Sequence, residues 1–209
     1  VTMLNAGDTL FVFPGYYRQK LLIDNLKGIV DKPVVIKGLG KVTIAAPENV
    51  QLQEGELVIG NFDVPLHDPA HLYYPYFRGA VIRVQHSEHV VLDGLRVINS
   101  PWFGLAAYEK DHLTVQYCYF EGHGASSFYL LNSRHPVVAF NEITRSNGFN
   151  ERIDSHGSQE CISVVNTDYA DIMYNRIHES KSFFYVEYQA TGVGGEGIDI
   201  KENSRYARV

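Results

Sequence analysis

A nine-residue segment recurs along the second half of this chain and constrains its fold more than any other feature. The segment at 89–97 returns at 112–120, 135–143 and 169–177, and a further copy begins at Tyr206. The copies start 23, 23, 34 and 37 residues apart, so the longer steps equal the basic unit with insertions of 11 and 14 residues. A repeat of this length predicts stacked structural units, each covering the apolar face of the next.

Equivalent positions of the copies share their chemistry, and apolar residues alternate with the period of two that is typical of β-strands. One apolar column is Leu92, Val115, Val138, Ile172 and Val209. A strand that precedes each copy supplies another column, which is Ile82, Leu105, Phe128, Ile162 and Ile198. Because strand side chains alternate, we expect the residues beside this second column to point outward, and they are Arg83, Ala106, Tyr129, Ser163 and Asp199.

These columns predict an all-β fold, a single-stranded right-handed parallel β-helix with rungs of about 23 residues. Leucine-rich repeats would show a Leu-x-x-Leu-x-Leu pattern, and propeller blades would need about 40 residues each. The insertions at 145–158 and 179–194 leave successive rungs at the same corner. We expect residues 1–209 to form one β-helix domain, and, since the last copy breaks off at Val209, to be truncated or to continue beyond it.

Composition excludes several classes of function. The net charge is −6 and Lys and Arg do not cluster, which argues against a nucleic-acid partner. No apolar run is long enough to span a membrane. The two cysteines provide no disulfide framework.

Two columns at the bends carry flat or amide side chains. Asn141 falls over Asn175, which predicts a short asparagine ladder whose amides pair from rung to rung. Three histidines share one column with two tyrosines, and these residues are His89, His112, His135, Tyr169 and Tyr206. A metal site is one interpretation of the histidines, but an aromatic stack accounts for all five residues.

The opening of the chain resembles a known family. Ala-Gly-Asp-Thr-Leu at 6–10, Pro-Gly-x-Tyr at 14–17 and Asp-Lys-Pro-Val-Val-Ile at 31–36 resemble pectate-lyase-like β-helix proteins. The likeness is greatest to polysaccharide lyase family 6, which includes alginate lyases and chondroitinase B. It implies a secreted or cell-envelope protein that acts on an acidic polysaccharide.

The same family carries a Glu-x-Ile-x-x-Lys motif on a rung strand. Glu196-Gly-Ile-Asp-Ile-Lys201 matches it, and Glu160-Cys-Ile-Ser-Val-Val165 has the Glu with Val in place of Lys. The resemblance implies that the Glu helps to hold calcium and that Lys201 is the general base. The family's catalytic arginine belongs to the following rung, which lies beyond Val209.

The residues themselves indicate a cation site. Glu160 and Glu196 fall in one column, about 5 Å apart at the backbone, and Asp199 points outward on the same strand as Glu196. Stacked carboxylates repel unless a cation or a shared proton relieves them, and calcium prefers such oxygens. The alternative is that these carboxylates are solvated or bonded to the inserted loops.

Lys201 is a candidate general base for β-elimination, provided that its pKa is lowered. The alternative is a surface lysine paired with Asp199 or Glu202. In the first insertion, Arg152 and His156 are candidates for neutralising the substrate carboxylate and for donating a proton. Both insertions are expected to form one wall of a groove or, alternatively, to pack on the flank of the helix.

Aromatic residues suggest where a sugar would lie. Tyr108 and Tyr129 are expected to face outward near Arg83, and Tyr185 lies in the second insertion. Tyrosine offers an apolar face and a hydroxyl edge, as sugar recognition requires, although such residues also serve cross-rung packing alone.

Two functions therefore remain open. The first is a polysaccharide lyase that cleaves an acidic glycan. The second is a non-catalytic structural, adhesive or filament-forming β-helix whose open ends pair with other copies, because an uncovered sheet edge invites pairing.

Overall fold

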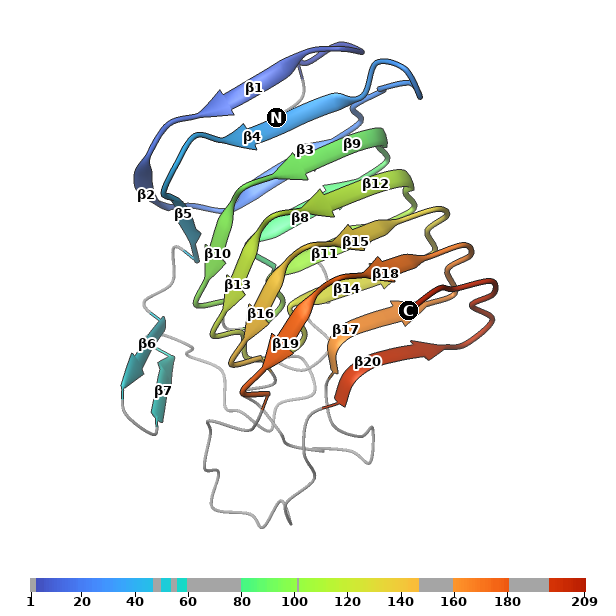
Figure 1. Cartoon of the computed structure of the whole chain (residues 1–209). Coiled ribbons are helices and arrows are strands. Elements are labelled where there is room, and N and C mark those ends of the chain that lie inside the picture. Colours follow the sequence, from blue (N-terminus) through green and yellow to red (C-terminus); the bar gives the residue numbers. More distant parts are fainter. Residues whose placement is uncertain are drawn as a thin grey trace.

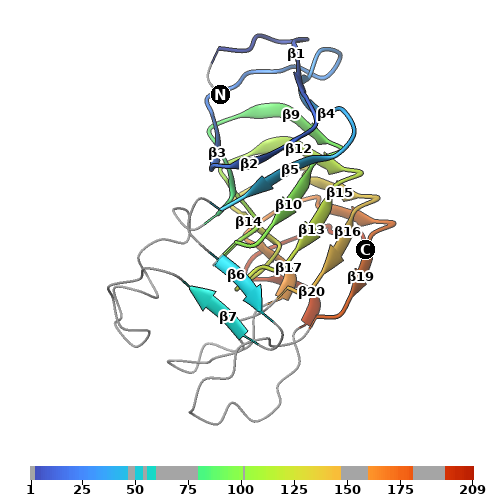
Figure 2. The same ribbon diagram turned by 90° about the vertical axis from the view of Figure 1, so that its left-hand side faces the viewer.

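A computed structural model describes residues 3–46, 80–100, 102–146, 160–180 and 196–209, together with the backbone of strands at 50–53 and 56–59. Three parallel six-stranded sheets stack into a coil, as Figure 1 and Figure 2 show. Each turn of the coil contains one strand from each sheet. The sheets are called A, B and C in the order in which the chain passes through them. The predicted all-β parallel β-helix is confirmed.

Sheet A contains the strands that begin each repeat, β1 (Thr9–Val12), β4 (Val34–Gly38), β9 (Glu88–Asp93), β12 (Asp111–Gln116), β15 (Val137–Ala139) and β18 (Asp171–Met173). Sheet B contains β2 (Gly15–Arg18), β5 (Val42–Ala45), β10 (Arg96–Ile98), β13 (Tyr119–Glu121), β16 (Glu142–Thr144) and β19 (Arg176–His178). Sheet C contains β3 (Leu21–Asp24), β8 (Ile82–Gln85), β11 (Leu105–Tyr108), β14 (Phe128–Leu131), β17 (Glu160–Val165) and β20 (Glu196–Lys201).

The register between rungs is the one that the sequence columns predict. Leu105 pairs with Ile82 on one side and with Phe128 on the other, and Ile36 pairs with Leu92. The inward side chains form one continuous core in which these residues are almost fully buried. Each rung contributes one residue to each column, so neighbouring rungs bury each other's apolar side chains, whereas Leu10 and Ile198, in the first and last described rungs, are only partly buried.

The chain is interrupted at one corner, where sheet B passes into sheet C. The connections β16–β17 and β19–β20 contain the two predicted insertions. A third interruption, between β5 and β8, leaves from the same corner. Within this interruption the structure describes a short antiparallel pair of strands, β6 (Val50–Gln53) and β7 (Glu56–Ile59).

At the corner where sheet C passes into sheet A, one inward position of most rungs is a hydroxyl residue. The backbone N–H of Ser133 donates to Thr167 Oγ1 (3.2 Å), and that of Thr167 donates to Ser204 Oγ (3.0 Å). Each hydroxyl also donates to a backbone carbonyl two or three residues earlier, as Ser133 Oγ does to Leu131 O at 3.1 Å. Lys110 occupies this position in one rung, where it is 3% exposed and its ammonium donates to the Tyr108 carbonyl.

Side chains also stack on the outside of the same corner. His89, His112, His135, Tyr169 and Tyr206 form the predicted column, with ring centroids 4.3 to 4.9 Å apart. All five residues have a positive φ, between 48° and 58°. The aromatic stack is confirmed. The described residues contain no helix that could cross a membrane.

Candidate functional site

The outer face of sheet C brings together the carboxylates that the sequence placed in one column. Glu160 pairs with Glu196 in the register of β17 and β20, as predicted. One oxygen from each of Glu160, Glu196 and Asp199 lies within 4.8 Å of the others. Three hard oxygen donors at this spacing fit the chemistry of calcium, although exposed carboxylates often cluster without a metal.

Glu160 reaches this face because β17 departs from strict alternation at its start. Cys161 and Ile162 are adjacent in sequence, yet both are fully buried in the core inside the coil. The side chain of Glu160 is only 5% exposed and nevertheless contacts Lys201 on the neighbouring strand. The carboxylate is therefore removed from water but keeps a cationic partner.

Lys201 supplies that partner. Its Nζ lies 2.9 Å from Glu160 Oε1 and 3.5 Å from Asp199 Oδ2. Burial lowers the pKa of the Lys201 amine, but the hydrogen bond and charge of Glu160, with those of Asp199, outweigh it and raise the pKa above the usual value. The lowered pKa that the role of general base requires is not found, because the carboxylates stabilise the ammonium form, and the contact with Asp199 is the pairing that the alternative interpretation predicts.

The predicted sugar-contacting residues do not form one open strip. Arg83 and Tyr129 share a column of sheet C, but Ala106 between them is fully buried. The Tyr129 ring stacks on Phe103, with centroids 4.8 Å apart, within a second apolar cluster on the outer side of the coil.

One of the predicted residues lies in a different column, toward sheet A. Tyr108 occupies this column, and Arg83 Nε points toward it by donating to Gln85 Oε1 at 2.7 Å. Gln85 Nε2 in turn donates to Asp24 Oδ2 at 2.8 Å. Arg83 is therefore already engaged in a polar network. Arg152, His156 and Tyr185 lie outside the described residues, so their roles remain predictions.

The histidine column offers another set of metal-ligating atoms. Asp111 Oδ1 lies 2.7 Å from His112 Nδ1 and 3.2 Å from His135 Nδ1. The two rings are stacked, with centroids 4.5 Å apart and an interplanar angle of 16°. Since each nitrogen lone pair lies in the plane of its own ring, one ion cannot lie in both planes. The geometry favours a carboxylate that bridges two stacked imidazoles.

Sequence reasoning missed two features beside this face. One is the burial of Lys110. The sequence signal for this burial was that Lys110 occupies the same position of the bend as Ser87, Ser133 and Thr167 do in other rungs. The other is a polar cavity at the junction of sheets C and A. Its signal was the recurrence of asparagine, at Asn132, Asn166 and Asn203, one or two residues after the strands of sheet C.

Comparison with known proteins agrees with the fold. A family model described as right handed beta helix region matches residues 76–208. The structure is similar to an alginate lyase from Paenibacillus sp. str. FPU-7, with a TM-score of 0.59 and 14% identity over 98% of this chain and 58% of that one. It is also similar to the pectate lyase Pel9A, with a TM-score of 0.60 and 12% identity over 92% of this chain and 50% of that one.

A third similar structure is a candidate glycosyl hydrolase from Parabacteroides merdae ATCC 43184, with a TM-score of 0.54 and 10% identity over 96% of this chain and 80% of that one. No curated protein sequence matches. The chain spans only half to three fifths of the length of the two lyases. At these identities the likeness establishes the architecture alone.

Proposed function

The chain belongs to the right-handed β-helix family, and from that premise we propose that it acts on carbohydrate, most like a polysaccharide lyase that cleaves an acidic glycan by β-elimination. The observation that carries the proposal is the outer face of sheet C. There Lys201 contacts Glu160 and Asp199, and Glu160 pairs with Glu196, the residue that begins the Glu-x-Ile-x-x-Lys motif ending at Lys201. Similarity of fold to an alginate lyase and a pectate lyase supports the proposed class of substrate.

In the proposed reaction, Lys201 Nζ removes the proton at C5 of a uronate unit. The electron pair released from the C–H bond forms the C4–C5 double bond, the C4–O bond breaks, and the leaving oxygen takes a proton. His156 is proposed as its donor and Arg152 as the partner of the substrate carboxylate. Because Glu160 and Asp199 hold the Lys201 amine in its protonated form, it must first release a proton to solvent before it can accept the one from C5.

Calcium is the proposed cofactor, and Glu160, Glu196 and Asp199 are its proposed ligands. The donor set fits, because carboxylate oxygens are what calcium prefers. The bound ion would supply positive charge beside the uronate carboxylate. The Lys201 ammonium competes for the same oxygens, since it contacts two of the three side chains.

The test is release of unsaturated, ultraviolet-absorbing ends from alginate, pectate or chondroitin, with and without calcium. Replacement of Lys201 by Met should reduce the rate about 100-fold or more if Lys201 is the base. The control is Lys27→Met, which removes an exposed lysine paired with Glu88 in the first rungs. Retained activity in Lys201→Met would remove Lys201 from the mechanism.

A second candidate is a glycan-binding protein without lyase activity. The observation that favours it is the ion pair of Lys201 with Glu160, which holds the amine in its protonated form. Binding of an acidic glycan that yields no unsaturated ends would support this function. We also propose that the protein is secreted and that the ends of its coil can pair with other copies.

A further inference from the structure

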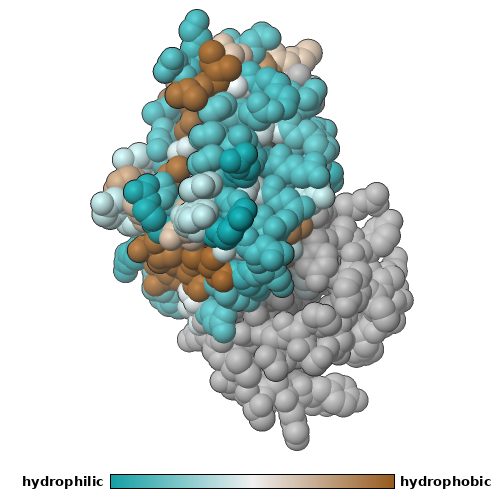
Figure 3. Space-filling view, turned by 90° about the vertical axis from the view of Figure 1, so that its right-hand side faces the viewer, coloured by the Kyte–Doolittle hydropathy of each residue, from teal (hydrophilic) through white to brown (hydrophobic). Residues whose placement is uncertain are grey.

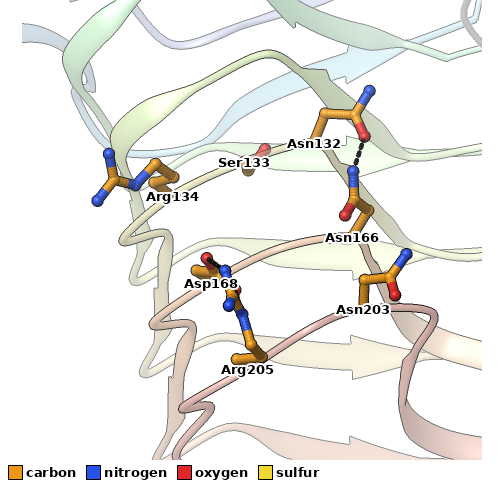
Figure 4. Close-up of a pocket in the computed structure, with 7 residues that line it drawn as sticks. All are labelled: Asn132, Ser133, Arg134, Asn166, Asp168, Asn203 and Arg205. Atoms are coloured by element: carbon orange, nitrogen blue, oxygen red, sulfur yellow. Dashed lines mark hydrogen bonds and ion pairs between the residues drawn. The ribbon is translucent and has the colours of Figure 1, made fainter.

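A polar trough lies where sheet C passes into sheet A, with a cavity volume of about 510 Å³. Two columns of side chains flank it, each with one residue from three successive rungs, as Figure 4 shows. The amide column is Asn132, Asn166 and Asn203, and the charged column is Arg134, Asp168 and Arg205. In Figure 3, which faces this side of the coil, most of the surface is hydrophilic.

The turn of the backbone does not by itself require asparagine here. Asn132, Asn166 and Asn203 have a φ of 50°, 45° and 53°, a left-handed conformation that asparagine tolerates well. In the earlier rungs, Asn25, His86 and Glu109 make the same turn with a φ of 58°, 48° and 52°. Backbone geometry therefore permits asparagine at this turn but does not require it.

The amides retain unused hydrogen-bonding capacity. Asn166 Nδ2 donates to Asn132 Oδ1 at 2.6 Å. Within the described part of the chain, no other side-chain hydrogen bond is found for these two amides, and none for Asn203. Each amide has two donors and an acceptor, so the column offers several groups to a hydroxyl-rich ligand.

The charged column carries a surplus of positive charge. Arg205 binds Asp168 through two hydrogen bonds, Nε to Oδ1 at 3.1 Å and Nη2 to Oδ2 at 2.8 Å, so these charges offset each other. The Arg134 side chain has no ion pair among the described residues, and in Figure 4 it extends away from the amide column. The trough therefore favours an anionic ligand.

The trough adjoins the candidate site. Asn203 lies two residues after Lys201, and Ser204 Oγ donates to the Lys201 carbonyl at 2.7 Å. A polymer that crosses the outer face of sheet C along β20 would leave that face beside the trough. The candidate site on sheet C and the trough can therefore contact different sugar units of one polymer.

We propose that the trough binds an acidic sugar unit, with Arg134 on its carboxylate and the amides of Asn166 and Asn203 on its hydroxyls. This inference extends the proposed function and rests on it for the class of ligand. An acidic peptide fits less well, because the trough is lined by polar and charged residues and offers no apolar pocket for side chains.

Isothermal titration calorimetry with unsulfated tetrasaccharides of galacturonate, mannuronate and chondroitin tests the proposal. Maltotetraose is the uncharged control ligand. At least one acidic oligosaccharide should bind, and maltotetraose at least tenfold more weakly. Arg134→Gln should weaken binding of the acidic ligand about tenfold, and Asn166→Ala about fivefold. Lys27→Gln is the matched control, because Lys27 lies in the column of Arg134 three rungs away and should leave affinity within twofold.

Titration reports binding whether or not the glycan is cleaved, so failure of the lyase proposal leaves this test intact. Arg134 and Asn166 are exposed, and thermal unfolding will verify that the variants fold. The proposal is overturned if none of the three acidic ligands binds, or if Arg134→Gln retains full affinity. It is also overturned if an aspartate-rich peptide binds as tightly as the glycan and is equally sensitive to Arg134→Gln.

Discussion

Lys201 and Glu160 form an ion pair between neighbouring rungs, with Nζ 2.9 Å from Oε1. The two partners differ in exposure, since the lysine side chain is one third exposed and the glutamate only 5%. The lysine can therefore exchange water for another contact, whereas the carboxylate depends on a cation from the protein or from solution. The proposed chemistry and the stability of the last rungs depend on the same contact.

Removal of the lysine should destabilise the fold more than removal of both partners. We expect Lys201→Met to cost about 2 kcal/mol of unfolding free energy, because it leaves the Glu160 carboxylate buried without its ammonium. The double variant Glu160→Gln with Lys201→Met should recover at least half of that loss. Urea unfolding measures both, and equal stability of the single and double variants would contradict the assigned pairing.

Calcium should stabilise the protein through the three carboxylates. At a free calcium concentration about 100 times Kd, the stabilisation would be about 2.7 kcal/mol. Glu196→Gln should abolish it, whereas Glu142→Gln should not, since Glu142 lies on sheet B and pairs with Arg176 and His178. A melting temperature that does not respond to calcium or to chelation would argue against the cofactor.

Burial of Lys110 should make stability depend on pH. Burial lowers the pKa of its amine from 10.5 to about 7. Below pH 7 the amine is protonated in the folded and unfolded states, so the cost of burying the charge is fully present. Between pH 7 and 10.5 only the unfolded chain keeps the proton, so the unfolding free energy should rise with pH.

A comparison of the parent protein with the Lys110→Thr variant isolates this effect. Threonine is a suitable replacement, because Thr167 occupies the equivalent position of the bend in a later rung. Relative to this variant, the unfolding free energy of the parent protein should rise by on the order of 1 kcal/mol from pH 6 to pH 9. The difference removes the contribution of other groups, such as the buried Cys118 thiol. Parallel pH profiles would show that Lys110 keeps its proton in the folded state.

The asparagine ladder should be among the costliest polar contacts to remove. Asn141 Nδ2 donates to Val115 O and to Asn175 Oδ1, both at 3.0 Å, and Asn141 Oδ1 accepts from Cys118 N at 2.9 Å. Asn141→Ala leaves these buried groups unpaired and should cost about 3 kcal/mol in denaturant unfolding. Asn175→Ala, nearer the end of the ladder, should cost less, and the reverse order would contradict this account.

The sequence predicts the coil well because its constraints are local and repeated. Inward columns such as Leu92 over Val115 follow from alternation within a strand and a fixed period between strands. The asparagine ladder and the aromatic stack follow from the same register. Fold and register could therefore be derived without knowledge of any distant contact.

The outer surface could not be predicted in the same way. Ala106 and Ser163 stand at outward positions, yet they are 0% and 1% exposed. Their burial depends on what lies over sheet C and not on strand alternation. Asp199 was among the expected partners of Lys201, but Glu160 was missed. Glu160 shares the parity of the inward residue Ile162 and reaches the face only because β17 breaks its alternation.

The shared columns also bear on how such a protein can change in length. A duplicated rung would meet apolar residues of the same kind above and below it, because Val84, Ala107, Leu130 and Val164 already repeat one pattern. Duplication of a single 23-residue unit would therefore preserve the existing core. It would lengthen the outer face by about 4.8 Å, which makes the reach of the protein along a polymer adjustable by tandem gain or loss of one module.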